Sequence, residues 1–469
     1  MTLESFGHSI PSLAGHSSRN GAATRHAFSL PAVIVTSVAA AVLAACGGGA
    51  NDTVAPEAMG LGAQSGGRPI AITPGSDVIA YWNQIAASTI NLPPAATGTP
   101  EERRPVYNLD FATVHVAMFD AVNAIDGSYR RFAAQPTTAT AGASLEAAAA
   151  SAAYHVLKGL FPNRAAQYQA AYDSYVAALP EGDARTRGLQ IGQEVAVQIV
   201  ALRANDGRFT PVTYTPTNLP GRFRGTNPIN TFLPFVRPFT LHSADQFRAD
   251  GPPPLTSAEY AADVNETRAL GAANSSVRTP QQTEIARFYT EPPPSYWARN
   301  LRIFATADRG IAENARTMAA LWTVQADALI ACFETKYHFD FWRPFSAIQL
   351  ADTDGNAATD ADPSWAPVVP TPNHPEYPAA HSCGTGAAAE SLRQVFGTKR
   401  LSFAWNSTVT GTTHHFDSTD DLGKEVQLGR IAGGMHFRTS TVHGEVLGMK
   451  VGKWVLKNHF QPIARGATD

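Results

Sequence analysis

Helical periodicity is the feature that most constrains this fold. Residues 310–339, GIAENARTMAALWTVQADALIACFETKYHF, form one long run with apolar residues at helical spacing and no proline. Residues 108–127 repeat that spacing. This segment ends in VHVAMFDAVNAIDG and stops at a glycine. Alanine is abundant and long β-branched alternation is scarce, so the sequence predicts an all-α protein.

A Pro-rich connection divides the predicted helices into two groups. The segments before it are 108–127, 143–162, 165–179 and 186–204. Residues 206–254 are irregular, and connections of that length are often functional or join two bundles. We therefore expect two packed helical bundles with long Pro-rich connecting loops, in a single domain at 80–469. The first bundle would span about 80–205 and the second 255–469.

The N-terminal segment has the pattern of an export signal. Residues 28–45 contain no charge and follow Arg19 and Arg25. The segment ends in LAAC and a Gly-rich stretch, which resembles a bacterial lipoprotein signal. This resemblance implies a signal peptide at 1–45 and lipid attachment to Cys46, although an ordinary signal peptide with an incidental cysteine is the alternative.

The same resemblance predicts where the protein resides. A flexible tether would span 46–79, and Gly47, rather than aspartate, follows Cys46. That residue implies export to the bacterial outer membrane, with the protein facing the periplasm or the cell surface. Composition adds that the chain of 469 residues, 44% apolar, can bury a large core. With a net charge of −3 and no basic run, nothing in it indicates nucleic-acid binding.

Two cations stand close together in the apolar stretch KYHFDFWRPFSAI. Lys336 and Arg343 are seven positions apart, so in a continuous helix they would lie within about 20° of one face. Pro344 disfavours helix at the residue before it, which places Arg343 at a loop edge. Like charges in a partly buried pocket require an anion, whereas two solvent-facing cations at a helix end are the simpler alternative.

Two later segments add residues of the same kind. His381 precedes a run of small residues that predicts a tightly packed helix, and it would lie near that helix's N-terminus, where anions bind. Arg430 and His436 are six positions apart, and Gly433 and Gly434 between them should end the helix that carries Arg430.

Together the segments resemble the signature shared by vanadium-dependent haloperoxidases and type 2 phosphatidic acid phosphatases. That signature reads Lys, six residues, Arg-Pro; then Pro-Ser-Gly-His; then Ser-Arg, five residues, His. The sequence from about 80 to 465 is more similar to the bacterial haloperoxidases than to the membrane phosphatases. The matching positions are Lys336, Arg343, Pro344, Pro378, Ala379, Ala380, His381, Gly429, Arg430 and His436.

The resemblance implies a role for each position. Lys336, Arg343 and Arg430 would bind the equatorial oxygens of vanadate, and His436 would be its axial ligand. His381 would hydrogen-bond the opposite apical oxygen and move protons. The Ala380 N–H would replace that of the family's glycine. His381, Lys336 and His436 would thus be the catalytic residues.

Two positions depart from the pattern. The motif serine is Ala379, so one side-chain hydrogen bond to the oxyanion is missing, which costs about 1–3 kcal/mol if that oxygen stays unpaired. The aspartate often found four residues after the axial histidine is Ser440, which puts the support of His436 in question.

The function implied is oxidation of a halide by hydrogen peroxide to hypohalous acid, with vanadate as cofactor. Bromide or iodide is expected before chloride, and a small organic acceptor is a further candidate partner. The alternatives are a phosphatase that uses His436 as nucleophile and a non-catalytic helical lipoprotein.

Structural predictions also follow for residues outside the signature. Trp342 and Phe345 are predicted to wall the pocket. His115 and Asp120, on an apolar helix, are predicted to be core polar groups. The predicted loop residues are His414 and His415.

The two remaining cysteines flank the signature. Cys332 lies one helical turn before Lys336, and Cys383 lies two residues after His381. If Lys336 and His381 meet one anion, the cysteines should be close. A disulfide and two free thiols in the core both remain open.

Overall fold

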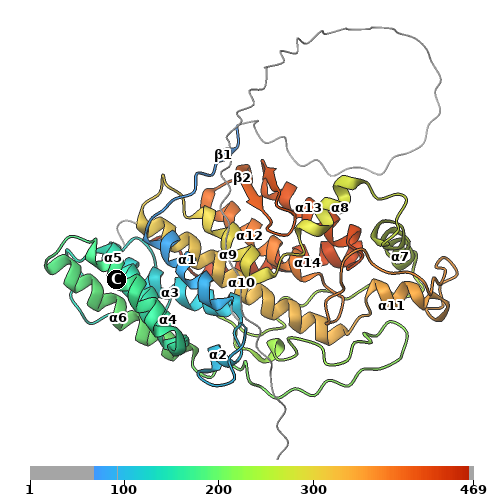
Figure 1. Cartoon of the computed structure of the whole chain (residues 1–469), viewed down its shortest axis with the longest axis horizontal. Helices are drawn as coiled ribbons and strands as arrows, with labels where there is room; N and C mark the ends of the chain where they lie inside the picture. The colour runs from blue at the N-terminus through green and yellow to red at the C-terminus, as the bar shows by residue number, and fades with distance from the viewer. Residues whose placement is uncertain (1–67, 92, 464–469) are drawn as a thin grey trace, which may run out of the picture. The chain divides into compact units, whose positions relative to one another are not determined.

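The computed structural model describes residues 68–91 and 93–463. The predicted signal peptide, Cys46 and most of the tether lie outside these residues. The described chain is mainly helical, as predicted, with one small three-stranded sheet that was not predicted (Figure 1).

The first group of helices precedes the long connection. Helix α3 ends at Gly127, whose φ of 73° is a left-handed conformation that glycine adopts without strain. The elements of this group are α1 (Val78–Ile90), α2 (Pro100–Arg103), α3 (Tyr107–Asp126), α4 (Leu145–Leu160), α5 (Ala165–Ala177) and α6 (Asp183–Arg203).

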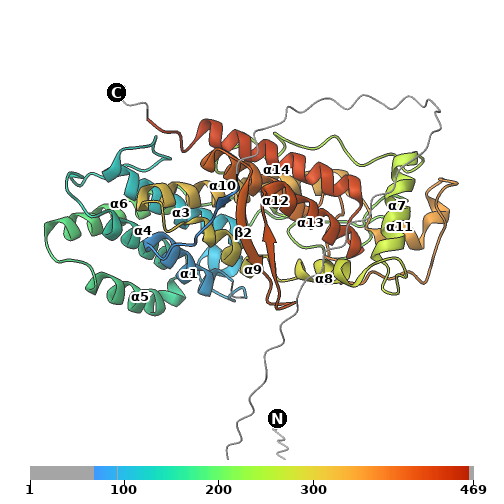
Figure 2. The same cartoon turned by 90° about the horizontal axis from the view of Figure 1, so that it is seen from above.

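The second group follows the connection, in which a single 3₁₀ turn (Leu233–Phe235) interrupts irregular chain. The group comprises α7 (Ala258–Gly271), α8 (Pro280–Phe288), α9 (Pro293–Leu301), α10 (Ile311–Phe339), α11 (Pro344–Gln349), α12 (Ala380–Phe396), α13 (Thr419–Ala432) and α14 (Arg438–Asn458). In two perpendicular views, α4 to α6 lie at one end and α7 and α11 at the other (Figures 1 and 2).

One apolar core joins the two groups. Buried side chains of α3, α10, α12 and α14 belong to the same cluster, so the two bundles pack as one unit. Helices α12 and α14 approach closely through glycines: a Cβ on Gly448 would lie 2.0 Å from the Cys383 carbonyl oxygen. The prediction of a tightly packed small-residue helix after His381 is therefore confirmed.

The small sheet corrects two expectations. Strand β1 (Ile70–Ala71) pairs in parallel with β2 (Leu401–Asn406), so the predicted tether is already structured at residue 70, and α1 begins before residue 80. Strand β3 (Thr413–Phe416) pairs antiparallel with β2 and contains His414 and His415, which were predicted to be in a loop.

Carboxylates on two helices fix the ring of His414. Its Nδ1 lies 2.6 Å from Glu425 Oε1 and its Nε2 lies 2.9 Å from Glu284 Oε2. Burial lowers the pKa of His414, but the two carboxylates outweigh burial and raise that pKa above its ordinary value. His414 thus links β3 to α8 and α13. Separately, no helix within the described ranges is both long and apolar enough to cross a membrane.

Candidate active site

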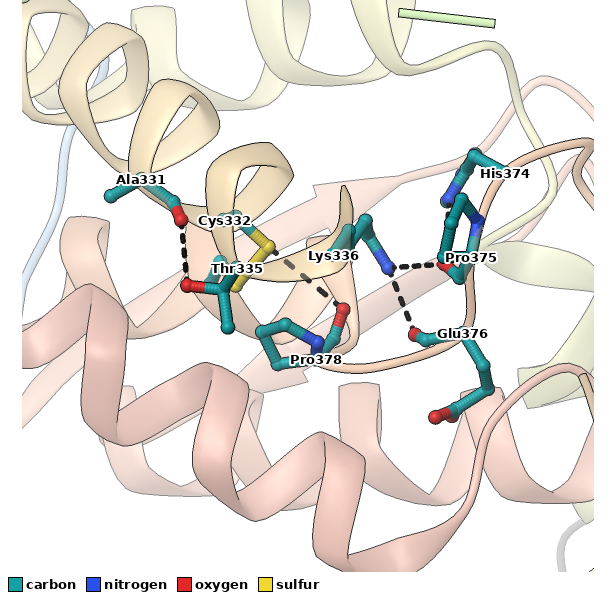
Figure 3. The surroundings of a disulfide bond; sticks show 9 residues. Ala331, Cys332, Thr335, Lys336, His374, Pro375, Glu376 and Pro378 are labelled. Atoms are coloured by element: carbon teal, nitrogen blue, oxygen red, sulfur yellow. Dashed lines mark hydrogen bonds between the residues drawn. A yellow bond between two sulfur atoms is a disulfide. The ribbon is translucent and has the colours of Figure 1, made fainter. Parts of the chain in front are cut away.

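Lys336 is a fully buried cation in the last turn of α10. Its Nζ donates to the carbonyl oxygens of Pro375 (3.0 Å) and Glu376 (2.9 Å) (Figure 3). Helix α10 ends three residues later, because Asp340 has a left-handed φ of 51°. The common-face geometry considered for Lys336 and Arg343 therefore does not apply, since the chain leaves the helix between them.

Arg343, the residue that precedes α11, extends into the same region. This confirms its predicted place at a loop edge. Its Nε donates to the His374 carbonyl oxygen (2.8 Å), and its Nη1 donates to the Met435 carbonyl oxygen (2.9 Å). The same Nη1 lies 3.2 Å from His436 Nε2, so two of the predicted residues are in direct contact.

His436 lies in the turn between α13 and α14, as predicted, and a buried carboxylate orients its ring. Glu376 Oε1 lies 2.8 Å from His436 Nδ1 and accepts the Phe437 backbone N–H at 3.0 Å. Because Arg343 Nη1 can only donate, His436 Nε2 accepts from it, so Nδ1 carries the proton and donates to Glu376 Oε1. The lone pair of His436 is then on Nε2, the atom that faces Arg343.

Arg430, in the last turn of α13, completes the set of cations. Its Nη1 donates to the Tyr289 carbonyl oxygen (3.2 Å) and its Nη2 lies 3.0 Å from the Met435 sulfur. Arg430 is buried, and no partner for its Nε is found within the described chain. A buried guanidinium N–H without a partner is available to an oxyanion.

The start of α12 supplies the remaining predicted residues. Ala380 is the first residue of this helix and His381 the second, and no side chain caps the helix. The backbone N–H groups of the first turn are therefore free of helical partners, and the helix dipole favours an anion there. Burial lowers the pKa of His381 well below its ordinary value, and Arg430 and Lys336 lower it further.

The cluster has too little negative charge for its cations. Burial lowers the pKa of Arg343 to about 10 and that of Arg430 to about 9, and the pKa of Lys336 falls well below its ordinary value. Glu376 lies beside them, and burial raises its pKa to about 7 although Lys336 and Arg343 lower it. Three buried cations beside one carboxylate are unfavourable without a further anion.

A cavity of about 610 Å³ opens onto this cluster. Ala380, His381, Arg430 and His436 are part of its lining, whereas Lys336 and Arg343 lie behind that lining. The prediction that Trp342 and Phe345 wall the cavity is wrong. Trp342 packs in a second apolar cluster with Tyr260 and Phe437, and Phe345 is 40% exposed. Both follow Asp340, where the chain leaves helix α10.

Two residues of this site were missed by sequence reasoning. His374 lines the cavity, and its Nδ1 lies 3.0 Å from Arg343 Nη2. Glu376 provides the support for His436 that Ser440 was expected to lack. The sequence contained a signal for both residues. The stretch NHPEYP places a histidine and a single acid in a proline-fixed loop just before His381.

Two polar residues of α3 were predicted to be core groups, and this is confirmed. His115 Nε2 lies 3.0 Å from Asn83 Oδ1. Asp120 accepts backbone N–H groups of residues 132, 133 and 134. Neither residue lines the cavity.

A disulfide joins α10 to α12 behind the site. Cys332 and Cys383 form this bond across 51 positions of sequence, which resolves the question that the sequence left open (Figure 3). Both residues lie close in sequence to site residues, Cys332 to Lys336 and Cys383 to His381. The bond therefore fixes the two helices that supply Lys336 and His381.

Removing this bond should destabilise the fold. For a loop of this length, Cys332→Ala with Cys383→Ala is expected to lower the free energy of unfolding by about 3–4 kcal/mol. Urea denaturation of the double variant and wild type measures the difference. Thiol counting on the denatured, unreduced protein is the control: reactive thiols from both cysteines would show that the bond is absent.

Comparison with known proteins identifies the arrangement. Residues 316–465, which contain every cation and histidine of the site, match the family model described as the VCPO second helical-bundle domain. This part of the chain is therefore similar to vanadium-dependent haloperoxidases. Vanadium chloroperoxidase from Curvularia inaequalis is 25% identical over 68% of this chain and 66% of that protein. The chain thus spans just under two thirds of that relative's length.

Solved structures of bacterial vanadium-dependent haloperoxidases share the fold of this chain. A structure described as the first bacterial vanadium-dependent iodoperoxidase is 24% identical, with a TM-score of 0.66 over 83% of this chain and 97% of that one. A holo-type bacterial vanadium-dependent chloroperoxidase is 18% identical, with a TM-score of 0.62 over 81% of this chain and 97% of that one. This chain therefore has the same fold as these two bacterial proteins.

Proposed function

We propose that this protein is a vanadate-dependent haloperoxidase that uses hydrogen peroxide to oxidise bromide or iodide to hypohalous acid. One observation carries the proposal: His436, oriented by Glu376, directs Nε2 toward buried cations at the base of a cavity. The match of residues 316–465 to the VCPO second helical-bundle domain, and relatives described as vanadium chloroperoxidase and iodoperoxidase, support it.

The residues present fit vanadate. The site offers cationic N–H donors and the Nε2 lone pair of His436, a set that suits an oxyanion whose metal takes one nitrogen ligand. Within the part of the chain that the structure describes, no group of three or more His, Cys, Asp and Glu side chains could hold a simple cation. The unpartnered Arg430 Nε–H and the free backbone N–H groups at the start of α12 would bond the oxyanion's oxygen that the missing serine leaves without a donor.

The protein's own groups would then act as follows. Lys336 Nζ, which has three N–H bonds and donates two to backbone carbonyls, would direct the third at the oxyanion. Arg343 and Arg430 would offset its charge, and His436 Nε2 would bind the metal. His381, with its lowered pKa, is neutral and can accept a proton from hydrogen peroxide and later return it. Vanadate, when bound, would supply Lewis-acid activation of peroxide without a change of oxidation state.

The choice of halide is tested by parallel assays. The purified protein, loaded with orthovanadate, is given hydrogen peroxide with chloride, bromide or iodide in turn. Oxidation of iodide and bromide, at rates above that of chloride, is the expected result. Chloride oxidation at an equal or higher rate would contradict the proposed preference, because chloride requires the most strongly activated peroxide.

We further propose that the protein is exported and lipid-anchored at the outer membrane. The LAAC sequence and the Gly-rich segment after it support this proposal. The chain would be held at the surface through Cys46 rather than by a helix that spans the membrane.

Cys46→Ser should release the protein from membranes. Since the cysteine sulfur is the only predicted attachment point, the variant should appear in soluble or uncleaved form with its peroxidase activity intact. Membrane fractionation measures the release, and mass spectrometry of the native N-terminus is the control. A native protein without lipid on Cys46 would show that the segment is an ordinary signal peptide.

A further inference from the structure

Outside the cavity, one histidine is bound by two carboxylates at once. His414, on β3, has its Nδ1 2.6 Å from Glu425 Oε1 on α13 and its Nε2 2.9 Å from Glu284 Oε2 on α8. A carboxylate accepts hydrogen bonds, so both ring nitrogens can donate only when the ring is the doubly protonated imidazolium. The His414 side chain is 14% exposed, so its ring can exchange a proton with solvent. The state of this ring therefore depends on pH.

The groups that face the ring favour the protonated state. Burial lowers the pKa of His414, but the hydrogen bonds and charges of Glu425 and Glu284 outweigh burial and raise that pKa above its ordinary value. From α8, the uncharged ring of Phe288 stacks on the imidazole with 3.9 Å between centroids. On β2, the residue paired with His414 is Trp405, which is also uncharged. His414 should therefore lose its second proton at a higher pH than an ordinary histidine does.

The Glu425 carboxylate also binds Tyr289, the residue that follows α8. Tyr289 Oη donates to Glu425 Oε1 at 2.8 Å, and this is the same oxygen that faces His414. Burial raises the pKa of Tyr289 well above its ordinary value, so the hydroxyl keeps its proton. A Cβ on Gly429 of α13 would lie 2.9 Å from Tyr289 Cδ2, so the tyrosine packs tightly against that helix. The position of Glu425 therefore affects where Tyr289 lies.

Tyr289 in turn binds a cation of the candidate active site. Its carbonyl oxygen accepts from Arg430 Nη1 at 3.2 Å, while Arg430 Nε has no partner within the described chain. Tyr289 thus contacts α13 at two points, Glu425 through its hydroxyl and Arg430 through its carbonyl. Groups behind a ligand-binding side chain fix its orientation and tune its affinity. A shift of Tyr289 would therefore move the guanidinium that is available to an oxyanion.

We propose that protonated His414 is a positioning residue for Arg430, so that the affinity of the site for an oxyanion depends on the protonation of His414. When the ring loses its second proton at higher pH, a nitrogen lone pair faces a carboxylate oxygen, and this repulsion loosens the contacts between β3, α8 and α13. Glu425 and Tyr289 are then held less firmly, and Arg430 binds the anion less well. The inference rests on the proposed function only where it names vanadate as the oxyanion.

The dependence is tested first on the wild-type protein, without turnover. ¹⁵N NMR follows the titration of His414 with and without saturating orthovanadate or inorganic phosphate. If protonated His414 favours the anion, the bound anion must raise the proton affinity of His414 by the same factor. That factor should be about fivefold or more, the lower end of ordinary coupling between two sites. His415, the next residue of β3, is the matched control, because a direct effect of the anion's charge would raise the pKa of both histidines.

A conservative variant then separates positioning from a merely structural role. In Glu284→Gln, the introduced amide N–H can donate to His414 Nε2 while the amide oxygen still accepts from Thr412 Oγ1, so a neutral ring fits. Equilibrium dialysis measures vanadate and phosphate affinity for wild type and variant between about pH 6 and pH 9. The ratio of the two affinities should change by about fivefold or more over this range, with wild type the weaker at high pH. Asp420→Asn, which removes a charge from α13 at a residue paired with Lys399, should keep the wild-type profile.

The two ions separate this inference from the proposed function. A constant ratio of affinities for wild type and Glu284→Gln, or a pKa of His414 that rises no more than that of His415, would overturn the inference. A wild type that binds phosphate but not vanadate would instead count against the proposed function, and the phosphate data would still decide the inference. Binding of neither ion would overturn both.

Discussion

His436→Ala should abolish vanadate binding and halide oxidation together. The variant removes the nitrogen lone pair that His436 presents beside Arg343, and Arg343 and Arg430 cannot replace it because guanidinium groups have none. Loss of a residue that merely supports a metal ligand costs about 10–100-fold in affinity, so loss of the ligand itself should cost more than about 100-fold. Equilibrium dialysis with vanadium analysis measures the affinity, and iodide oxidation measures the activity.

Variants of two other histidines test whether the loss of vanadate binding is specific to His436. His155→Ala, on α4 outside the cavity, should bind vanadate as wild type does. His381→Ala should retain part of the vanadate but lose turnover, since His381 supplies proton transfer rather than the bond to the metal. If His436→Ala bound vanadate as tightly as His155→Ala, the axial assignment would be wrong.

Glu376→Ala should weaken vanadate binding by about 10–100-fold. Without the carboxylate, the proton of His436 is no longer held on Nδ1, and the ring loses its fixed orientation. An opposing effect exists, because removing a negative charge makes the cluster more attractive to an anion. Glu376→Gln separates the two: it removes the charge but keeps an acceptor oxygen, so it should retain most of the affinity.

The tautomer of His436 gives a readout that is independent of activity. In ¹⁵N NMR spectra of the protein without vanadate, wild type and Glu376→Gln should show His436 protonated on Nδ1, and Glu376→Ala should show a mixture. Glu194→Gln on α6 is the control for a distant acid. Equal affinity and equal spectra in all variants would show that Glu376 has no positioning role.

The sequence was informative where local rules decide the structure. Gly127 ends α3, the glycines before His436 end α13, and Pro344 keeps Arg343 out of the helix, each because of backbone preferences that neighbours cannot change. The spacing of the cations and histidines was informative for a different reason: one anion requires them all, so their pattern is specific.

Where distant chain segments decide the structure, sequence reasoning failed. The lining of the cavity comes from many separate elements, among them α3, α9, α10, α12 and α13. Nothing local to Trp342 shows that it packs in another cluster. Glu376 was missed because its role exists only once its loop lies against the turn that carries His436. Strand β1 was missed because it has only two residues, too few to show a periodic pattern.

The response of the wild-type protein to vanadate tests the central claim most directly. Orthovanadate is titrated into metal-free protein, and iodide oxidation and hydrolysis of a chromogenic phosphate ester are followed in parallel. If Lys336, Arg343, Arg430 and His436 hold one vanadate, iodide oxidation should rise from near zero and level off at one equivalent, with phosphate competing. Ester hydrolysis without added metal that vanadate only inhibits would contradict the account and favour a phosphatase with His436 as its nucleophile.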